Sequence, residues 1–176
     1  MTGKSINIRP HQESDAEQIF RAVQESLPNV SPWMPDLNAD VSIEKIRTYI
    51  AAQPDHRLNR EAYNFAIVDG QDNFLGGCGL TEINWQHRFA NLYYWVRSSQ
   101  TRKGAASTAA RLLARFGFYE LELHRIEIVV AVDNLPSIRA AEKTGATREG
   151  RLRRRINVNG RVHDAFMYSL IPTDLN

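Results

Sequence analysis

The hydrophobic pattern of the chain changes period between residues 96 and 105. Residues 91–96 are an aromatic, β-branched run typical of a buried strand, whereas residues 105–121 carry alanine and leucine at helical spacing. A strand that leads directly into a helix is therefore predicted here. By the same reading, strands are predicted at residues 5–9, 63–68, 74–83, 89–96, 126–132, 147–156 and 162–170. Helices are predicted at residues 42–52 and 105–121. Another helix is predicted to begin after a cap at Ser14 or Asp15, and a further one to run from a cap at Asp133 or Asn134 to Gly145.

The segments between these elements are rich in turn-forming residues. Residues 69–73 and the pair Asn159-Gly160 indicate hairpins, and three glycines inside residues 74–83 indicate a bulge or a closely packed backbone. Residues 27–40 contain three prolines and are expected to form a loop that holds Trp33 and Met34. The element order is β-α-α-β-β-β-α-β-α-β-β, with one parallel crossover, which predicts an α+β fold with a mixed sheet.

The connection at residues 97–104 has the composition of an anion site. Arg102 and Lys103 precede Gly104, where free N–H groups and the positive dipole end of the predicted helix would meet a ligand. The small side chains of Ala105, Ala106 and Ser107 would let a diphosphate approach the backbone. An ordinary strand-to-helix turn with a solvated basic tip is the alternative.

Composition narrows the classes of protein that remain. The 176 residues fit one domain, residues 1–176, and the chain has neither an apolar leader nor a run long enough to span a membrane. We expect a soluble, cytoplasmic protein. Cys78 is the only cysteine, which excludes an internal disulfide and a cysteine-based zinc site. The net charge of +2 does not by itself favour nucleic acid, although arginines gather between residues 148 and 161.

Several short motifs together carry a family resemblance across nearly the whole chain. They are Ile6-Asn-Ile-Arg-Pro, Ser31-Pro-Trp-Met-Pro, Leu92-Tyr-Tyr-Trp-Val, the loop ending in Gly104-Ala-Ala, Asn134-x-x-Ser137, Glu142-Lys-x-Gly-Ala and Arg148-Glu-Gly. The chain resembles the GCN5-related N-acetyltransferase (GNAT) superfamily, in the branch of ribosomal-protein N-terminal-alanine and N-terminal-serine acetyltransferases. The resemblance implies a mostly antiparallel sheet of six to seven strands, with helices on both faces and strands splayed where acetyl-CoA binds.

The resemblance also implies residues for the acetyl-CoA site. The family's loop pattern falls on residues 101–106, where Thr101 replaces the usual Gln or Arg. The implied cofactor contacts are Trp95, Val96, Arg97, Thr101, Arg102, Lys103, Gly104, Ala105, Ala106, Ser107, Asn134 and Ser137. Backbone at residues 95–97 would pair with the pantetheine arm, and Ser137 would protonate the leaving thiolate. The N–H near Val96 would stabilise the oxyanion.

The general base is less well marked. Asn91 stands where family members often carry a carboxylate, so Glu82 on the adjoining strand is the next candidate, with His87 and His163 behind it. Each of these has a plain alternative role on a sheet face or in a polar turn. The residues expected to line the acceptor groove are Trp33, Met34, Trp85 and His87.

The sequence thus predicts an acetyl-CoA-dependent N-acetyltransferase without a metal. The resemblance implies a peptide or protein α-amine as the acceptor. The absence of an evident strong base favours the same acceptor, because an α-amine with a pKa of about 7.7 to 8 is partly neutral near pH 7. A small amine such as a polyamine, an amino acid or an antibiotic is the alternative acceptor. A non-catalytic acyl-CoA-binding module and a nucleic-acid-binding module are further alternatives, the latter disfavoured because no stacking aromatics interleave with the arginines. No membrane partner is expected, and a homodimer is left open.

Overall fold

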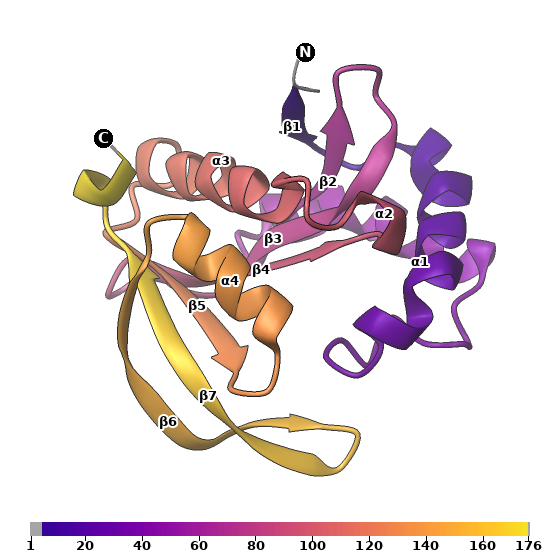
Figure 1. The fold of residues 1–176 in the computed structure, drawn as a ribbon. Helices are drawn as coiled ribbons and strands as arrows, with labels where there is room; N and C mark the ends of the chain where they lie inside the picture. The colour runs from indigo at the N-terminus through magenta and orange to yellow at the C-terminus, as the bar shows by residue number, and fades with distance from the viewer. Residues whose placement is uncertain (1–4, 176) are drawn as a thin grey trace.

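The structure, a computed structural model, describes residues 5–175 and joins seven strands in one sheet (Figure 1). The strands are β1 (Ile6–Arg9), β2 (Tyr63–Asp69), β3 (Phe74–Asn84), β4 (Phe89–Val96), β5 (Arg125–Ala131), β6 (Thr147–Val158) and β7 (Arg161–Leu170). The helices are α1 (Ala16–Val30), α2 (Ile43–Leu58), α3 (Ala105–Tyr119) and α4 (Leu135–Lys143), with 3-10 turns at η1 (Glu13–Asp15), η2 (Ser98–Gln100) and η3 (Pro172–Leu175). This order confirms the predicted succession of elements and the α+β class.

The sheet has the strand order β1-β2-β3-β4-β5-β7-β6. All neighbouring strands are antiparallel except β4 and β5, which are parallel. Helix α3 makes the crossover between these two strands, as the change of period predicts. The β6–β7 turn has positive φ at Asn159 (51°) and Gly160 (79°), the backbone that a two-residue hairpin with right-handed twist requires.

Two hydrophobic cores lie on opposite faces of the sheet. Leu92 and Tyr94 of β4 pack with α3 and α4, whereas Tyr93 and Trp95 pack with α1 and α2. The split follows from the alternation of side chains along a strand. In Figure 1, α3 and α4 lie in front of the strands. The two faces of β4 therefore look onto different surroundings, which matters for the site below.

The glycines of β3 make room for the aromatic residues of β4. A Cβ at Gly77 would lie 2.8 Å from Nε1 of Trp95, and one at Gly76 would lie 2.1 Å from the Trp95 carbonyl oxygen. Neither distance is compatible with a side chain, because the atom in contact is an indole ring or the backbone of the neighbouring strand. The prediction of a closely packed backbone is thus confirmed.

Two helices end later than predicted. Helix α1 continues through Pro28 to Val30, and α2 continues through Pro54 to Leu58, because a single proline removes only one N–H while the apolar face of each helix stays packed. Ser42 caps α2, accepting from the N–H of Lys45 at 3.2 Å, as predicted. The Asp15 side chain, in contrast, makes no cap bond to α1. It accepts instead from Arg9 at 2.8 Å and from the N–H of Gln12 at 2.8 Å, which closes the capping box of η1.

Candidate functional site

Strands β4 and β5 separate from one another along their length. They pair only at Phe89, Ala90 and Asn91 of β4, after which β5 stays with β7 and the remainder of β4 stays with β3. Within the described residues, the β5-facing side of residues 92–96 therefore lacks a strand partner. Unpaired main-chain groups on such an edge can hydrogen-bond to an extended ligand as an added strand would. This is the splay that the family resemblance implies.

Helix α3 follows β4 after the η2 turn, and within residues 5–175 no side chain caps its first N–H groups. The N-cap residue Gly104 has φ of 83°, a left-handed conformation that glycine adopts without strain. No atom lies within 4 Å of the position that a Cβ at Gly104 would take. Open space therefore lies beside Gly104 at the positive end of the helix dipole, as an anion site requires.

The loop before α3 is tied to α1. The Glu25 carboxylate accepts from Nε of Arg97 at 3.0 Å and from the N–H of Ser99 at 2.6 Å, and the Ser98 N–H donates to Oγ of Ser26 at 3.0 Å. The hydrogen bonds from Arg97 lower the pKa of Glu25 to about 2. Because the guanidinium of Arg97 is neutralised in this way, Arg97 offers a ligand its main chain and little net charge.

The other polar side chains of this loop differ in how far they are engaged. Nζ of Lys103 donates to the Ser99 carbonyl at 2.9 Å, and the Thr101 hydroxyl donates to the Ser98 carbonyl at 2.9 Å. Arg102 is exposed and has no hydrogen-bond or ion-pair partner within residues 5–175. The Arg102 guanidinium is therefore available to an anion, whereas the Lys103 ammonium keeps its charge but is already hydrogen-bonded to neutral oxygens of the loop. The Thr101 hydroxyl is used to hold the turn.

The start of α4 is linked to β4 across the splay. Oδ1 of Asn134 accepts from the Ser137 N–H at 3.3 Å, so Asn134 is the cap. The Ser137 hydroxyl donates to the Tyr94 hydroxyl at 3.2 Å, and the Tyr94 hydroxyl donates to the Ser137 carbonyl at 2.9 Å. Burial raises the pKa of Tyr94 to about 12, which keeps its hydroxyl protonated at neutral pH. Sequence reasoning missed Tyr94, although an aromatic residue with a polar tip on this strand was a signal.

On the opposite face of the sheet, three residues from separate segments meet. The Trp33 ring, from the loop after α1, packs edge-on against the His163 ring of β7, with 5.7 Å between centroids. Nδ1 of His163 lies 3.2 Å from Oδ2 of Asp133, the residue before the cap of α4. The side chain of His163 is only 8% exposed. Met34, also predicted for the acceptor groove, is partly buried against the α1–α2 core.

The structure separates the other predicted residues from this group. Trp85 and His87 lie in the turn before β4, at the far end of that strand from Val96, and Nε1 of Trp85 donates to the Arg60 carbonyl at 3.0 Å. The structure does not bring them together with Trp33. Glu82 is 70% exposed and lies 4.0 Å from a guanidinium nitrogen of Arg155. Roles for these three residues stay predictions.

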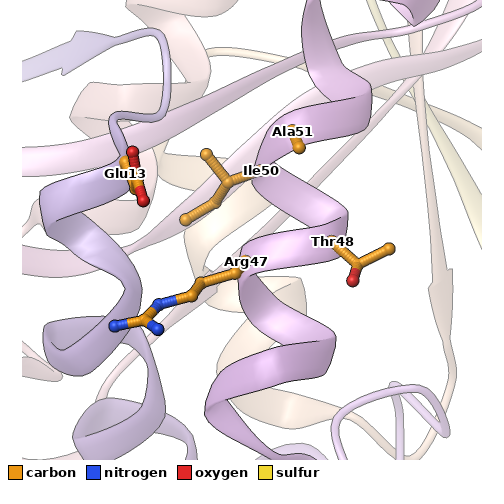
Figure 2. Close-up of a pocket in the computed structure, with 5 residues that line it drawn as sticks. All are labelled: Glu13, Arg47, Thr48, Ile50 and Ala51. Atoms are coloured by element: carbon orange, nitrogen blue, oxygen red, sulfur yellow. The ribbon is translucent and has the colours of Figure 1, made fainter.

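A groove of about 410 Å³ lies elsewhere, between η1 and α2 (Figure 2). Its lining residues are Glu13, Arg47, Thr48, Ile50 and Ala51. In Figure 2, Arg47 extends from α2 towards α1, and none of the predicted site residues is among those that line the groove. The acetyl-transfer machinery predicted from the sequence therefore does not involve this groove.

Residues 5–175 contain neither a candidate metal site nor a membrane-spanning helix. This part of the chain contains no group of three or more His, Cys, Asp or Glu side chains placed to hold a metal ion. None of its helices combines the length and apolarity that a membrane span needs. Cys78 is buried, and burial raises the pKa of its thiol, so thiolate chemistry at neutral pH is disfavoured.

Comparison with known proteins identifies the family. A family model described as an acetyltransferase (GNAT) domain matches residues 5–147. The chain belongs to this family. It is accordingly an acetyl-transferring enzyme of the GNAT type, and the open β4 edge beside the start of α3 is a feature of a GNAT fold. The resemblance seen in the sequence motifs is confirmed at the level of the superfamily.

The relatives of this GNAT enzyme differ in acceptor. YdaF of Bacillus subtilis (strain 168), which carries the provisional name of a ribosomal N-acetyltransferase, is 30% identical over 96% of this chain and 92% of its own length. A spermidine N(1)-acetyltransferase of Vibrio cholerae is 34% identical over 64% of this chain and 65% of its own. A solved ribosomal L7/L12 alpha-N-protein acetyltransferase in complex with coenzyme A superposes with a TM-score of 0.84 at 22% identity, covering 98% of this chain and 96% of that one, which shows a shared fold.

Proposed function

We propose that this GNAT enzyme transfers the acetyl group of acetyl-CoA to the α-amine of a peptide or protein N-terminus. The observation that carries the donor half of this proposal is the divergence of β4 and β5 next to the uncapped start of α3. The free β4 edge offers main-chain hydrogen-bond partners to an extended arm, and the start of α3 offers N–H groups to a diphosphate. Acetyl-CoA has both parts in one molecule, and the solved relative with coenzyme A has the same fold.

The donor would lie along the residues already described. Its pyrophosphate would bind the N–H groups of residues 104–107 beside Arg102, and its pantetheine arm would follow the backbone of residues 95–97. Asn134 would contact the arm from the side of α4. The thioester would then lie near Ser137, whose hydroxyl is held by Tyr94.

Charge on the acceptor side supports an α-amine over a polyamine. Three carboxylates, on β3, β5 and β7, are each matched with an arginine, which reduces their attraction for a polycation. The pairs are Glu82 with Arg155 (4.0 Å), Glu127 with Arg125 (2.8 Å) and Asp164 with Arg151 (2.8 Å). Arg153 and Arg154 on β6 are also exposed. A peptide N-terminus brings a single amine and tolerates basic surroundings, particularly if its chain is acidic.

The chemistry requires a neutral amine, a stabilised oxyanion and a protonated leaving group. An N–H of the free β4 edge near Val96 would donate to the oxyanion, and the Ser137 hydroxyl would donate to the thiolate. An α-ammonium group has a pKa about 2.5 units below that of a lysine side chain, so its deprotonation costs about 3.4 kcal/mol less. The α-amine therefore needs less help from a base than a lysine side chain does.

A small polyamine is the second candidate acceptor. The observation that favours it is the 34% identity to the spermidine N(1)-acetyltransferase of Vibrio cholerae, over 64% of this chain. That match leaves about a third of the chain uncovered, and the arginine-matched carboxylates described above argue against a polycation. We therefore place the polyamine second.

The proposal is tested with matched peptides and acetyl-CoA. One peptide has a free N-terminus and no lysine, a second has a blocked N-terminus and one internal lysine, and spermidine is the third acceptor. Mass spectrometry should show acetylation of the first peptide in preference to the other two. Equal acetylation of the blocked peptide would refute the α-amine assignment, and exclusive acetylation of spermidine would establish the second candidate.

A further inference from the structure

The group Trp33, His163 and Asp133 has a geometry that its structural role does not require. Three segments distant in sequence meet at the His163 ring: the loop after α1, β7 and the turn between β5 and α4. In Figure 1 these segments lie on the same side of the molecule, below the diverging ends of β4 and β5. Packing alone would be served by an apolar residue at position 163. An imidazole in this place calls for a chemical explanation.

The two nitrogens of the His163 ring have different surroundings. Nδ1 lies 3.2 Å from Oδ2 of Asp133, so that carboxylate favours the tautomer with hydrogen on Nδ1. Nε2 has no hydrogen-bond partner in the described part of the chain. Nε2 is also not fully buried. Among residues 5–175, a side-chain nitrogen or oxygen that is both buried and without a hydrogen-bond partner occurs at Nδ1 of His11 and not at Nε2 of His163. The ring is therefore oriented with an accessible lone pair on Nε2.

A series of contacts links His163 to Ser137, near which the thioester is expected. Asp133 directly precedes Asn134, whose side chain binds the N–H of Ser137, and Ser137 is joined to Tyr94 of β4. By strand alternation, His163 is on the face of β7 opposite to Tyr168, which packs in the α3–α4 core. The ring thus lies on the face of the sheet opposite to the α3–α4 core.

Other charged groups around the ring are already engaged. Asp164, next to His163 on β7, accepts from Arg151 at 2.8 Å and from the N–H of Arg154 at 2.7 Å. On β6, the register partner of His163 is the apolar Ile156, and Arg155 beside it lies 4.0 Å from Glu82. From the loop after α1, the contact is the neutral Trp33. Asp133 is the acidic group paired with the ring.

We infer that His163 is the general base of the acetyl transfer, that Asp133 is its positioning residue, and that Trp33 covers the ring at the acceptor entrance. This inference rests on the proposed function for the identity of the acceptor. Nε2 takes one proton from the acceptor ammonium group, and the neutral amine then forms the N–C bond with the acetyl carbon. Collapse of the tetrahedral intermediate breaks the C–S bond. The thiolate takes a proton from the Ser137 hydroxyl, the proton lost by the new amide nitrogen restores that hydroxyl, and Nε2 releases its proton to water.

A base at this position has a distinctive dependence on pH. With the base, the ammonium form of the acceptor is usable, whereas without it only the fraction of amine that is already neutral can react. That fraction is about a tenth at pH 7 for an α-amine of pKa about 8 and nearly all of it at pH 9. Loss of the base should therefore cost about tenfold more at pH 7 than at pH 9. A purely structural role would lower activity by the same factor at each pH.

The experiment measures kcat/KM for a peptide with a free N-terminus at pH 7, 8 and 9, with saturating acetyl-CoA. His163→Gln should lose activity with the pH dependence just described. Asp133→Ala, which keeps the imidazole and removes its carboxylate partner, should show a smaller loss of the same form, and circular dichroism checks that both variants are folded. His56→Gln is the matched control, because Nδ1 of His56 also lies beside a carboxylate, that of Glu61 at 2.8 Å, but at the exposed end of α2. It should leave the profile unchanged.

Several results would overturn the inference. A loss in His163→Gln and Asp133→Ala that is equal at all three pH values would assign both residues a structural role, and unchanged rates would remove them from the mechanism. A pH-dependent loss in Glu82→Gln instead would assign the base to Glu82. If the wild type acetylates spermidine and no peptide, the proposed function fails, yet the same variants assayed with spermidine still decide whether His163 is the base.

Discussion

Replacing Ser137 by alanine should separate catalysis from binding. The change removes one hydrogen bond to Tyr94, of 3.2 Å, and leaves the cap by Asn134 intact because that bond uses the main-chain N–H of residue 137. The second contact, from the Tyr94 hydroxyl to the carbonyl of residue 137 at 2.9 Å, also survives. The structural cost is thus that of a single bond, about 0.5 to 1.5 kcal/mol.

Loss of a general acid has a larger effect than this. Positioned proton transfer contributes about 10²- to 10⁴-fold to a rate, which corresponds to about 2.7 to 5.5 kcal/mol. In Ser137→Ala, kcat should accordingly fall by about 10² or more, while the Kd for acetyl-CoA rises by less than about tenfold. The first quantity is measured by release of the CoA thiol and the second by isothermal titration calorimetry.

Tyr94→Phe is the companion variant, since it removes the hydroxyl partner and keeps Ser137. If Ser137 alone donates the proton, Tyr94→Phe should lower kcat less than Ser137→Ala does. The reasoning is refuted if Ser137→Ala changes kcat by no more than it changes Kd, because the thiolate would then take its proton from another group or from water.

Three further predictions concern the donor site. Gly104→Glu should abolish acetyl-CoA binding in calorimetry without changing the circular-dichroism spectrum, because it places bulk and negative charge in the open space before α3; Gly104→Ala has the same positive φ without the charge and should keep most of the affinity. Asn134→Ala should weaken binding more than it lowers kcat. The pKa of Glu25 is lowered from 4.5 to about 2, so its ionised form contributes stability that is fully present above pH 4.5 and is lost as the pH falls towards 2. Glu25→Gln should therefore make the fall of Tm with decreasing pH less steep in that range. An unchanged slope would contradict the pairing of Glu25 with Arg97.

The parts of the fold that depend on local pattern were predictable. The change from strand to helix period near Gly104, the Asn159-Gly160 hairpin and the cap at Asn134 each depend on residues close together in sequence. The glycines of β3 likewise signalled close packing, because their neighbours are aromatic residues one strand away. The predicted acetyl-CoA site depends largely on such local features, which is why a location for it could be proposed from the sequence.

The acceptor side could not be predicted in the same way. His163 and Asp133 are 30 residues apart, and Trp33 comes from the far end of the chain; only tertiary packing brings them together. Trp85 and His87 were assigned to the acceptor groove from the sequence, but they lie in the turn between β3 and β4, at the other end of β4 from Val96. The sequence of a turn does not indicate which end of the sheet faces the ligand. Tyr94 was missed because its partner, Ser137, approaches from a helix 43 residues later.

The most direct test of the account is a competition in a single reaction. An N-terminal peptide with a free α-amine, an acidic body and one internal lysine is mixed with spermidine at equal concentration and limiting acetyl-CoA, and fragment-ion mass spectrometry locates the acetyl group. We expect the acetyl mass on the peptide α-nitrogen, with lysine and spermidine left largely unmodified. Acetyl found mainly on spermidine or on the lysine side chain would contradict the proposed function.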